Sequence, residues 1–132
     1  IQRSWQPGDT VSCEMEMEPE RVYAHPMVRA DAGCVALRRG PIIYTFEGVD
    51  NGEDLQTLRI PREAKIETLP YQAELLEGIV ALRVTGCRKK AAVNPALYAE
   101  DAAPEEMVTL QAIPYYAWCN RGMTHMRVWM QE

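Results

Sequence analysis

The chain has 132 residues, of which 47% are hydrophobic and 25% charged, with a formal net charge of −5. Such a chain can bury a substantial core and is not disordered, and its acidic balance, with only short basic runs, excludes nucleic acid as a partner. No apolar run approaches the roughly 18 residues of a membrane-spanning helix, and the start lacks a signal-peptide pattern, so we expect no membrane partner and a cytoplasmic location.

The first predicted element is a strand over residues 10–18. Apolar side chains occupy every second position there and polar ones the positions between, which is typical of a strand with one buried face. Cys13 falls on the apolar face, where it would act as a small buried hydrophobe. Pro19 should end this strand, because proline cannot donate a backbone hydrogen bond.

Further short strands follow along the chain, separated by turn-forming residues. Gly40-Pro41 should reverse the chain between two of them, and Asn51-Gly52 indicates a loop. A single helical turn is expected within residues 73–78, and residues 88–106, with two prolines, should make a long excursion over the surface. The predicted strands cover residues 34–37, 42–46, 58–60, 65–68, 78–86, 107–113 and 125–130.

Eight or nine short strands with frequent turns predict an all-β fold. We expect an antiparallel β-sandwich, jelly-roll-like and with little helix, formed by residues 1–132 as one domain. Two packed sheets would enclose its core.

The residues do not form a recognisable catalytic or metal-binding pattern. His25 and His125 are the only histidines, and neither has an evident partner, so both are interpreted as structural. The four cysteines contain no Cys-x-x-Cys pair, which argues against zinc and favours reduced thiols in a reducing compartment. The acidic cluster between Asp50 and Asp54 lacks the ligand spacing of a calcium loop.

The most distinctive stretch is "IPYYAWCNRG", residues 113–122. Its aromatic rings could stack on a sugar, with polar side chains donating hydrogen bonds to hydroxyls. Alternatively, aromatic residues and arginine are also enriched at protein interfaces, and composition favours this structural role. The candidate interface or sugar-contact residues are Tyr115, Tyr116, Trp118, Asn120 and Arg121.

Two long blocks resemble the bacterial β-L-arabinofuranosidases, which are zinc-dependent cysteine glycosidases. The blocks are "AHPMVRADAGCVALRRGPIIYTFEGVDN" and "IPYYAWCNRGMTHMRVWM", and they occur in the family's order. The segments "RSWQPGDTVSCEMEMEPERV" and "LLEGIVALRVTG" are also similar, so the resemblance covers nearly the whole chain.

The resemblance implies a supporting role for this chain. In that family, zinc and the catalytic residues belong to an (α/α)6 barrel, whose cysteine pattern has no match here, so no catalytic or metal-binding residue and no cofactor is expected in this chain. The chain would be a C-terminal β-sandwich of a larger glycoside hydrolase, itself inactive. Its expected partners are its own catalytic barrel and a second copy in a homodimer, with a carbohydrate-binding module as the alternative.

Overall fold

The computed structural model describes residues 1–90 and 97–132. These residues form nine strands, so the predicted all-β class is confirmed. Helical structure is limited to α1 (Gly48–Asn51) and the 3-10 turns η1 (Arg29–Asp31), η2 (Leu55–Thr57) and η3 (Tyr115–Ala117). None of the described helices is long and apolar enough to cross a bilayer. The strands are β1 (Pro19–Val22), β2 (Cys34–Arg39), β3 (Ile42–Glu47), β4 (Leu58–Arg59), β5 (Ile66–Thr68), β6 (Leu82–Lys89), β7 (Glu105–Pro114), β8 (Met126–Arg127) and β9 (Met130–Gln131).

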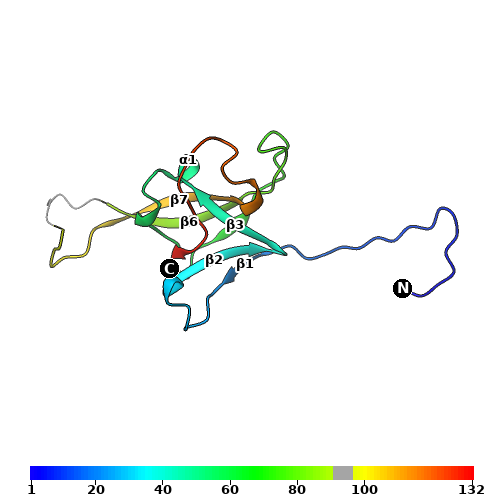
Figure 1. Ribbon diagram of the computed structural model, residues 1–132, viewed down its shortest axis with the longest axis horizontal. Coiled ribbons are helices and arrows are strands. Elements are labelled where there is room, and N and C mark those ends of the chain that lie inside the picture. The colour runs from blue at the N-terminus through cyan, green and yellow to red at the C-terminus, as the bar shows by residue number, and fades with distance from the viewer. Residues whose placement is uncertain (91–96) are drawn as a thin grey trace.

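The strand pairings close into a ring around one core (Figure 1). The order runs β2-β9-β4-β6-β7-β3, and β3 then pairs with β2 again. All pairs are antiparallel except β4 with β9. Where the sequence predicts two packed sheets, the described residues form one nine-stranded sheet that closes on itself, with β1, β5 and β8 as additions to the ring.

The main core fills the inside of this ring. Its largest fully buried side chains include Leu37, Tyr44, Phe46 and Leu110. Tyr44 and Phe46 alternate on β3, as a strand facing a core requires. The buried Tyr44 hydroxyl donates a hydrogen bond to the carbonyl of Val80 at 2.7 Å, so its polar atom does not go unpaired.

The hairpin between β2 and β3 follows the prediction from the sequence. Gly40 has a φ of +56°, a conformation that glycine adopts without a steric penalty. Its lack of a side chain has a second use, because Met17 lies directly over it, and a Cβ at this position would overlap the Met17 sulfur.

The prediction of a strand over residues 10–18 is wrong for this chain. The first strand begins at Pro19 and pairs with β2, in a register that places Pro19 opposite Arg39. Since β2 ends there and turns back, residues before Pro19 have no neighbouring strand. They extend away from the body, and Cys13 is exposed rather than buried (Figure 1).

Three other segments differ from expectation. The loop predicted at Asn51-Gly52 contains α1 and η2, and the helical turn predicted within residues 73–78 is absent, with Leu76 and Glu77 at positive φ. The final strand is two strands, since β8 pairs with β3 while β9 pairs with β2 and β4. The surface excursion predicted for residues 88–106 lies partly outside the described residues, and β6 and β7 frame it.

Candidate functional site

The aromatic loop, residues 113–122, lies at one end of the ring beside the neighbouring loop, residues 70–78 (Figure 1). The loop begins at the end of β7, passes through η3 and leads toward β8. A second, smaller core holds the two loops together. Ile113 and Ala117 of the aromatic loop pack there with Ile79 and Ala81, and Leu75 and Leu76 of the neighbouring loop cover them.

Arg121 is bound within the protein rather than directed to solvent. Its guanidinium donates hydrogen bonds to Glu47 Oε2 at 2.5 Å and to Asp50 Oδ1 at 2.8 Å. Glu47 closes β3, and its side chain is 0% exposed, whereas that of Arg121 is 21% exposed. The hydrogen bond with Asp50, and then that with Glu47, holds the pKa of Arg121 well above its usual value. The arginine therefore stays charged and neutralises a buried carboxylate.

The same carboxylate fixes the backbone of the loop. Glu47 Oε1 accepts a hydrogen bond from the Cys119 N–H at 2.7 Å. Cys119 has a φ of +63°, which costs energy for a residue with a side chain and persists only where surrounding contacts impose it. This hydrogen bond is one such contact. Glu47 therefore both pairs with Arg121 and holds the loop backbone at Cys119.

Asn51 ties the base of the loop to two strands. Its Nδ2 donates to the carbonyls of Glu47 and Gln111, each at 2.9 Å, and its Oδ1 accepts from the Gln111 N–H at 2.9 Å. The side chain is buried, and all of these hydrogen bonds are made by backbone groups of β3 and β7. Asn51 thereby acts as a bridge that positions β7 just before the aromatic loop.

The aromatic side chains face solvent in an uneven arrangement. Tyr115 is 44% exposed and Tyr116 is 66% exposed, while Trp118 is half-buried. The rings of Tyr115 and Trp118 have centroids 6.4 Å apart and planes inclined by 37°, so they do not form one flat platform. Asn120 is exposed, with its Nδ2 donating to the Ala117 carbonyl at 3.1 Å.

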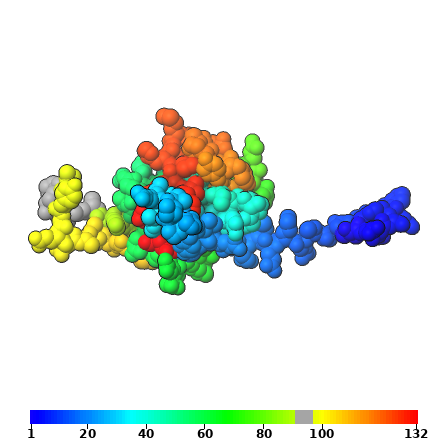
Figure 2. Space-filling model, turned by 60° about the horizontal axis from the view of Figure 1, so that its bottom comes forward, coloured from blue at the N-terminus to red at the C-terminus, as the bar shows by residue number. Residues whose placement is uncertain are grey.

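A groove of about 420 Å³ separates the two loops. Leu76 and Glu77 line one side, and Tyr116, Ala117 and Asn120 line the other. In the space-filling view, the chain after β7 protrudes from the body beside the neighbouring loop (Figure 2). The end of the molecule therefore has a shallow depression lined by aromatic, apolar and polar side chains.

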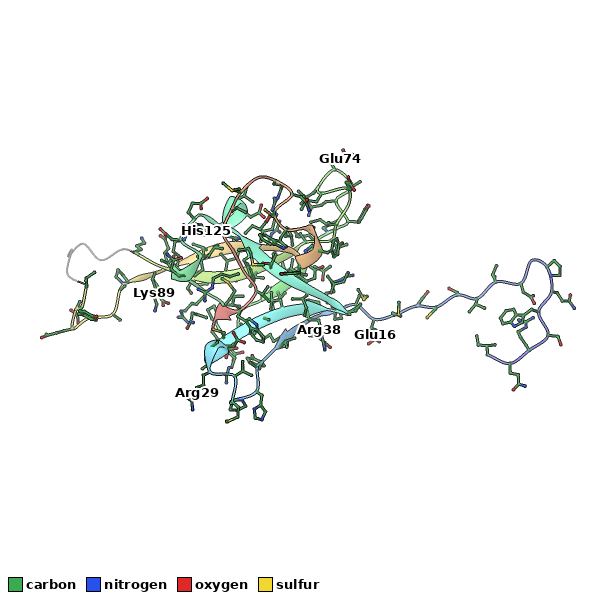
Figure 3. The ribbon with its side chains drawn as sticks, in the orientation of Figure 1. Glu16, Arg29, Arg38, Glu74, Lys89 and His125 are labelled. Carbon is green, nitrogen blue, oxygen red and sulfur yellow. The ribbon has the colours of Figure 1, made fainter. Side chains whose placement is uncertain are left out.

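The two histidines considered for catalysis, His25 and His125, line different depressions of the surface. His25 is exposed, and its Nδ1 accepts a hydrogen bond from the Met27 N–H at 3.2 Å. His125 is also exposed, and its carbonyl accepts from the Gly48 N–H at 2.8 Å (Figure 3). Neither contact places an imidazole beside a nucleophile.

The cysteines do not converge on a metal site. Cys34 Sγ lies 3.3 Å from Gln131 Nε2, and Cys87 Sγ lies 3.4 Å from Met107 Sδ, while Cys13 and Cys119 are exposed. All four thiols are free, and among residues 1–90 and 97–132 no group of three or more histidine, cysteine or acidic residues could hold a metal ion. The resemblance places the zinc centre of the family in the catalytic barrel, outside this chain.

Sequence reasoning did not find Glu47, Asp50 and Asn51 as partners of the loop. One signal was present, because Glu47 ends the apolar run of β3, where neighbouring positions on both faces of the strand are buried. A charged residue in such a position needs a partner of opposite charge. The sequence does not say which arginine provides it.

The model of the glycoside hydrolase family 127 C-terminal domain matches residues 19–131. The chain belongs to this family. It is also 37% identical to the non-reducing end β-L-arabinofuranosidase of Bifidobacterium longum subsp. longum, over 95% of this chain and 20% of that protein. The resemblance noted in the sequence is thereby confirmed.

Solved structures agree with this assignment. The crystal structure of Ara127N-Se, a family 127 β-L-arabinofuranosidase from Geobacillus stearothermophilus T6, superposes with a TM-score of 0.83 at 47% identity, over 88% of this chain and 18% of that one. The family 127 β-arabinofuranosidase BT3674 superposes with a TM-score of 0.74 at 32% identity, over 88% of this chain and 17% of that one. The chain thus spans about a fifth of the length of these relatives, and this C-terminal domain belongs to a larger protein.

Proposed function

We propose that this family 127 C-terminal domain is a non-catalytic accessory domain of a longer β-L-arabinofuranosidase-like glycoside hydrolase. Its aromatic loop packs against the catalytic part of that protein and supports it. The observation that carries this proposal is the exposure of Tyr115 and Tyr116 on a loop whose charged side chain is bound internally.

The polar chemistry of the loop supports a structural role. Arg121 and the Cys119 N–H are both committed to Glu47, so neither is free to bind a ligand. At the groove, the side chains of Tyr116 and Leu76 lie beside the polar side chains of Glu77 and Asn120. Protein interfaces are enriched in aromatic residues and have polar rims, so the exposed Tyr115 and Tyr116 beside polar side chains fit a contact site.

A test of the first part of the proposal is hydrolysis. The 132-residue chain should release no aryl group from aryl β-L-arabinofuranosides, with or without added zinc, because the described residues offer no metal cluster and no base beside a nucleophile. Turnover above the buffer rate would overturn the non-catalytic assignment.

A test of the second part uses an aspartate scan in the longer protein. Tyr116→Asp should lower the melting temperature of the longer protein, because it buries a carboxylate in the proposed interface. Tyr98→Asp is the matched control, since Tyr98 is 92% exposed and does not line the groove. If both variants melt like the unmodified protein, the aromatic loop is not an interface.

Carbohydrate binding is the competing function. Sugar-binding platforms need rings that a flat sugar face can cover, and the 37° inclination between Tyr115 and Trp118 does not favour one. Titration with arabino-oligosaccharides should therefore leave tryptophan fluorescence unchanged. A saturable change that Trp118→Ala abolishes would favour the carbohydrate-binding module instead.

Association of two copies is the other expected partnership. The aromatic loop offers the same exposed surface to a second copy as to a catalytic domain. Light scattering of the 132-residue chain and of its Tyr116→Asp variant separates these cases. If the 132-residue chain forms a stable dimer and the Tyr116→Asp variant is monomeric, the aromatic loop is the homodimer interface rather than the contact with the catalytic domain.

A further inference from the structure

Residues 1–18 extend from the body of the domain as an arm, as the views in Figures 1 to 3 show. The sequence of this arm is that of a strand. Val11 and Met15 share one face in an extended chain and are 57% and 75% exposed, while Glu14 and Glu16 occupy the opposite face. An apolar face of this length is ordinarily covered.

The arm has defined ends. Asp9 N–H donates to the Gln6 carbonyl at 3.0 Å, and between them stand Pro7 and Gly8, with Gly8 at a φ of +96°. Proline followed by a glycine at positive φ is typical of a type II turn. The Asp9 side chain strengthens this turn, since its Oδ2 accepts from the Gln6 N–H at 2.8 Å. A chain reversal on one side and Pro19 on the other thus delimit residues 10–18, a length within the usual range of a strand.

In this structure, residues 10–18 pair with no strand in the described part of the domain. The edge strand β1 already pairs with β2, and its first residue lies opposite the last residue of β2. Beyond that point β2 turns back at Gly40, so residues 10–18 pass the end of the sheet. Met17 contacts the body at Gly40.

We infer that residues 10–18 form a β-strand in a second sheet, which belongs to the part of the same polypeptide outside this sequence. The family model begins at residue 19, whereas the match to the Bifidobacterium longum protein, covering 95% of this chain, reaches into the arm. This chain makes up only 20% of that protein, so most of that polypeptide lies outside this domain. The arm then anchors the domain to its neighbour by backbone hydrogen bonds and a buried apolar face.

Pairing between two copies of the arm is less favourable. Glu14, Glu16 and Glu18 lie on one face, and antiparallel pairing of identical segments would set carboxylates opposite or diagonal to carboxylates. Like charges directly across a strand pair are destabilising. A sheet edge in the same polypeptide carries no such constraint.

Hydrogen exchange measured by mass spectrometry tests this inference. In the 132-residue chain, the amides of residues 10–18 should exchange at the rate of an unstructured peptide. In the longer protein, at least alternate amides of this segment should exchange 100-fold or more slowly, because strand pairing protects them. Exchange that is equally fast in both proteins would overturn the inference, and protection in the 132-residue chain that grows with its concentration would show that the partner is a second copy.

A pair of variants in the longer protein tests the predicted faces. Met15→Ser should reduce the protection of residues 10–18, whereas Glu16→Ser, on the opposite face, should leave it unchanged. Equal effects of the two variants would contradict a strand with one buried face. The inference depends on family membership and not on the role of the aromatic loop, so loss of one leaves the other standing.

Discussion

Replacement of Arg121 by methionine should strongly destabilise the domain. The change removes the cation that faces Glu47, whose side chain is 0% exposed, and leaves a buried carboxylate without its ion-pair partner. Breaking a buried pair in this way costs about 3–5 kcal/mol. The Cys119 N–H continues to donate to Glu47, so we expect the lower end of this range. The free energy of unfolding typically falls by about 1–3 kcal/mol for each molar increase in urea, so the urea concentration at the midpoint of unfolding should fall by at least about 1 M.

The matched control is Arg38→Met, at an ion pair with Glu20 in which both side chains are about half exposed, at 47% and 56%. Exposed pairs contribute about 0–1 kcal/mol, so this variant should unfold close to the unmodified chain. Urea unfolding followed by tryptophan fluorescence measures both. Combining Arg121→Met with Glu47→Gln removes the buried charge. The double variant should therefore lose less free energy of unfolding than the two single variants lose together. If Arg121→Met and Arg38→Met unfold at the same urea concentration, the ion pair of Arg121 with Glu47 does not stabilise the domain.

Two further predictions concern backbone conformation and acid stability. Cys119→Val should lower the free energy of unfolding by about 1–3 kcal/mol, because a β-branched residue is strained at a φ of +63°, while Cys119→Gly should not; equal losses would exclude backbone strain as the cause. The pKa of the Glu132 carboxyl is held below its usual value first by the hydrogen bond from Tyr23 and then by that from Arg62. Because the folded state binds this proton less readily than the unfolded state, the stability gained is present above the ordinary carboxyl pKa and is lost as the pH falls through the lowered one. The free energy of unfolding should therefore fall less steeply with decreasing pH in the Glu132→Gln variant. An unchanged slope would contradict this assignment.

The strands of the core could be predicted because their signal is local. On β3, alternation of side chains places Tyr44 and Phe46 in the core, and the turn at Gly40 follows from its neighbour proline and its own conformational freedom. The ring closure could not be predicted. It depends on β9, which is only two residues long and lies between β2 and β4, two strands distant from it in the sequence.

The site shows the same division between local and distant information. The aromatic loop was evident from composition, but the contact of Arg121 with Glu47 joins residues 74 positions apart. Nothing local to either residue selects that pair from the other charged residues. The arm shows a failure of local information, since the alternation of residues 10–18 predicts a strand with a buried face, whereas these residues form no strand in this structure and Val11 and Met15 are exposed.

Hydroxyl-radical footprinting of the aromatic loop most directly tests the claim that this domain docks on the rest of a longer glycoside hydrolase. Tyr115 and Tyr116 are exposed in this chain and should be modified readily, as should Tyr98, which does not line the groove. In the longer protein, the account predicts strong protection of Tyr115 and Tyr116 with unchanged modification of Tyr98. Equal modification of all three tyrosines in both proteins would contradict it.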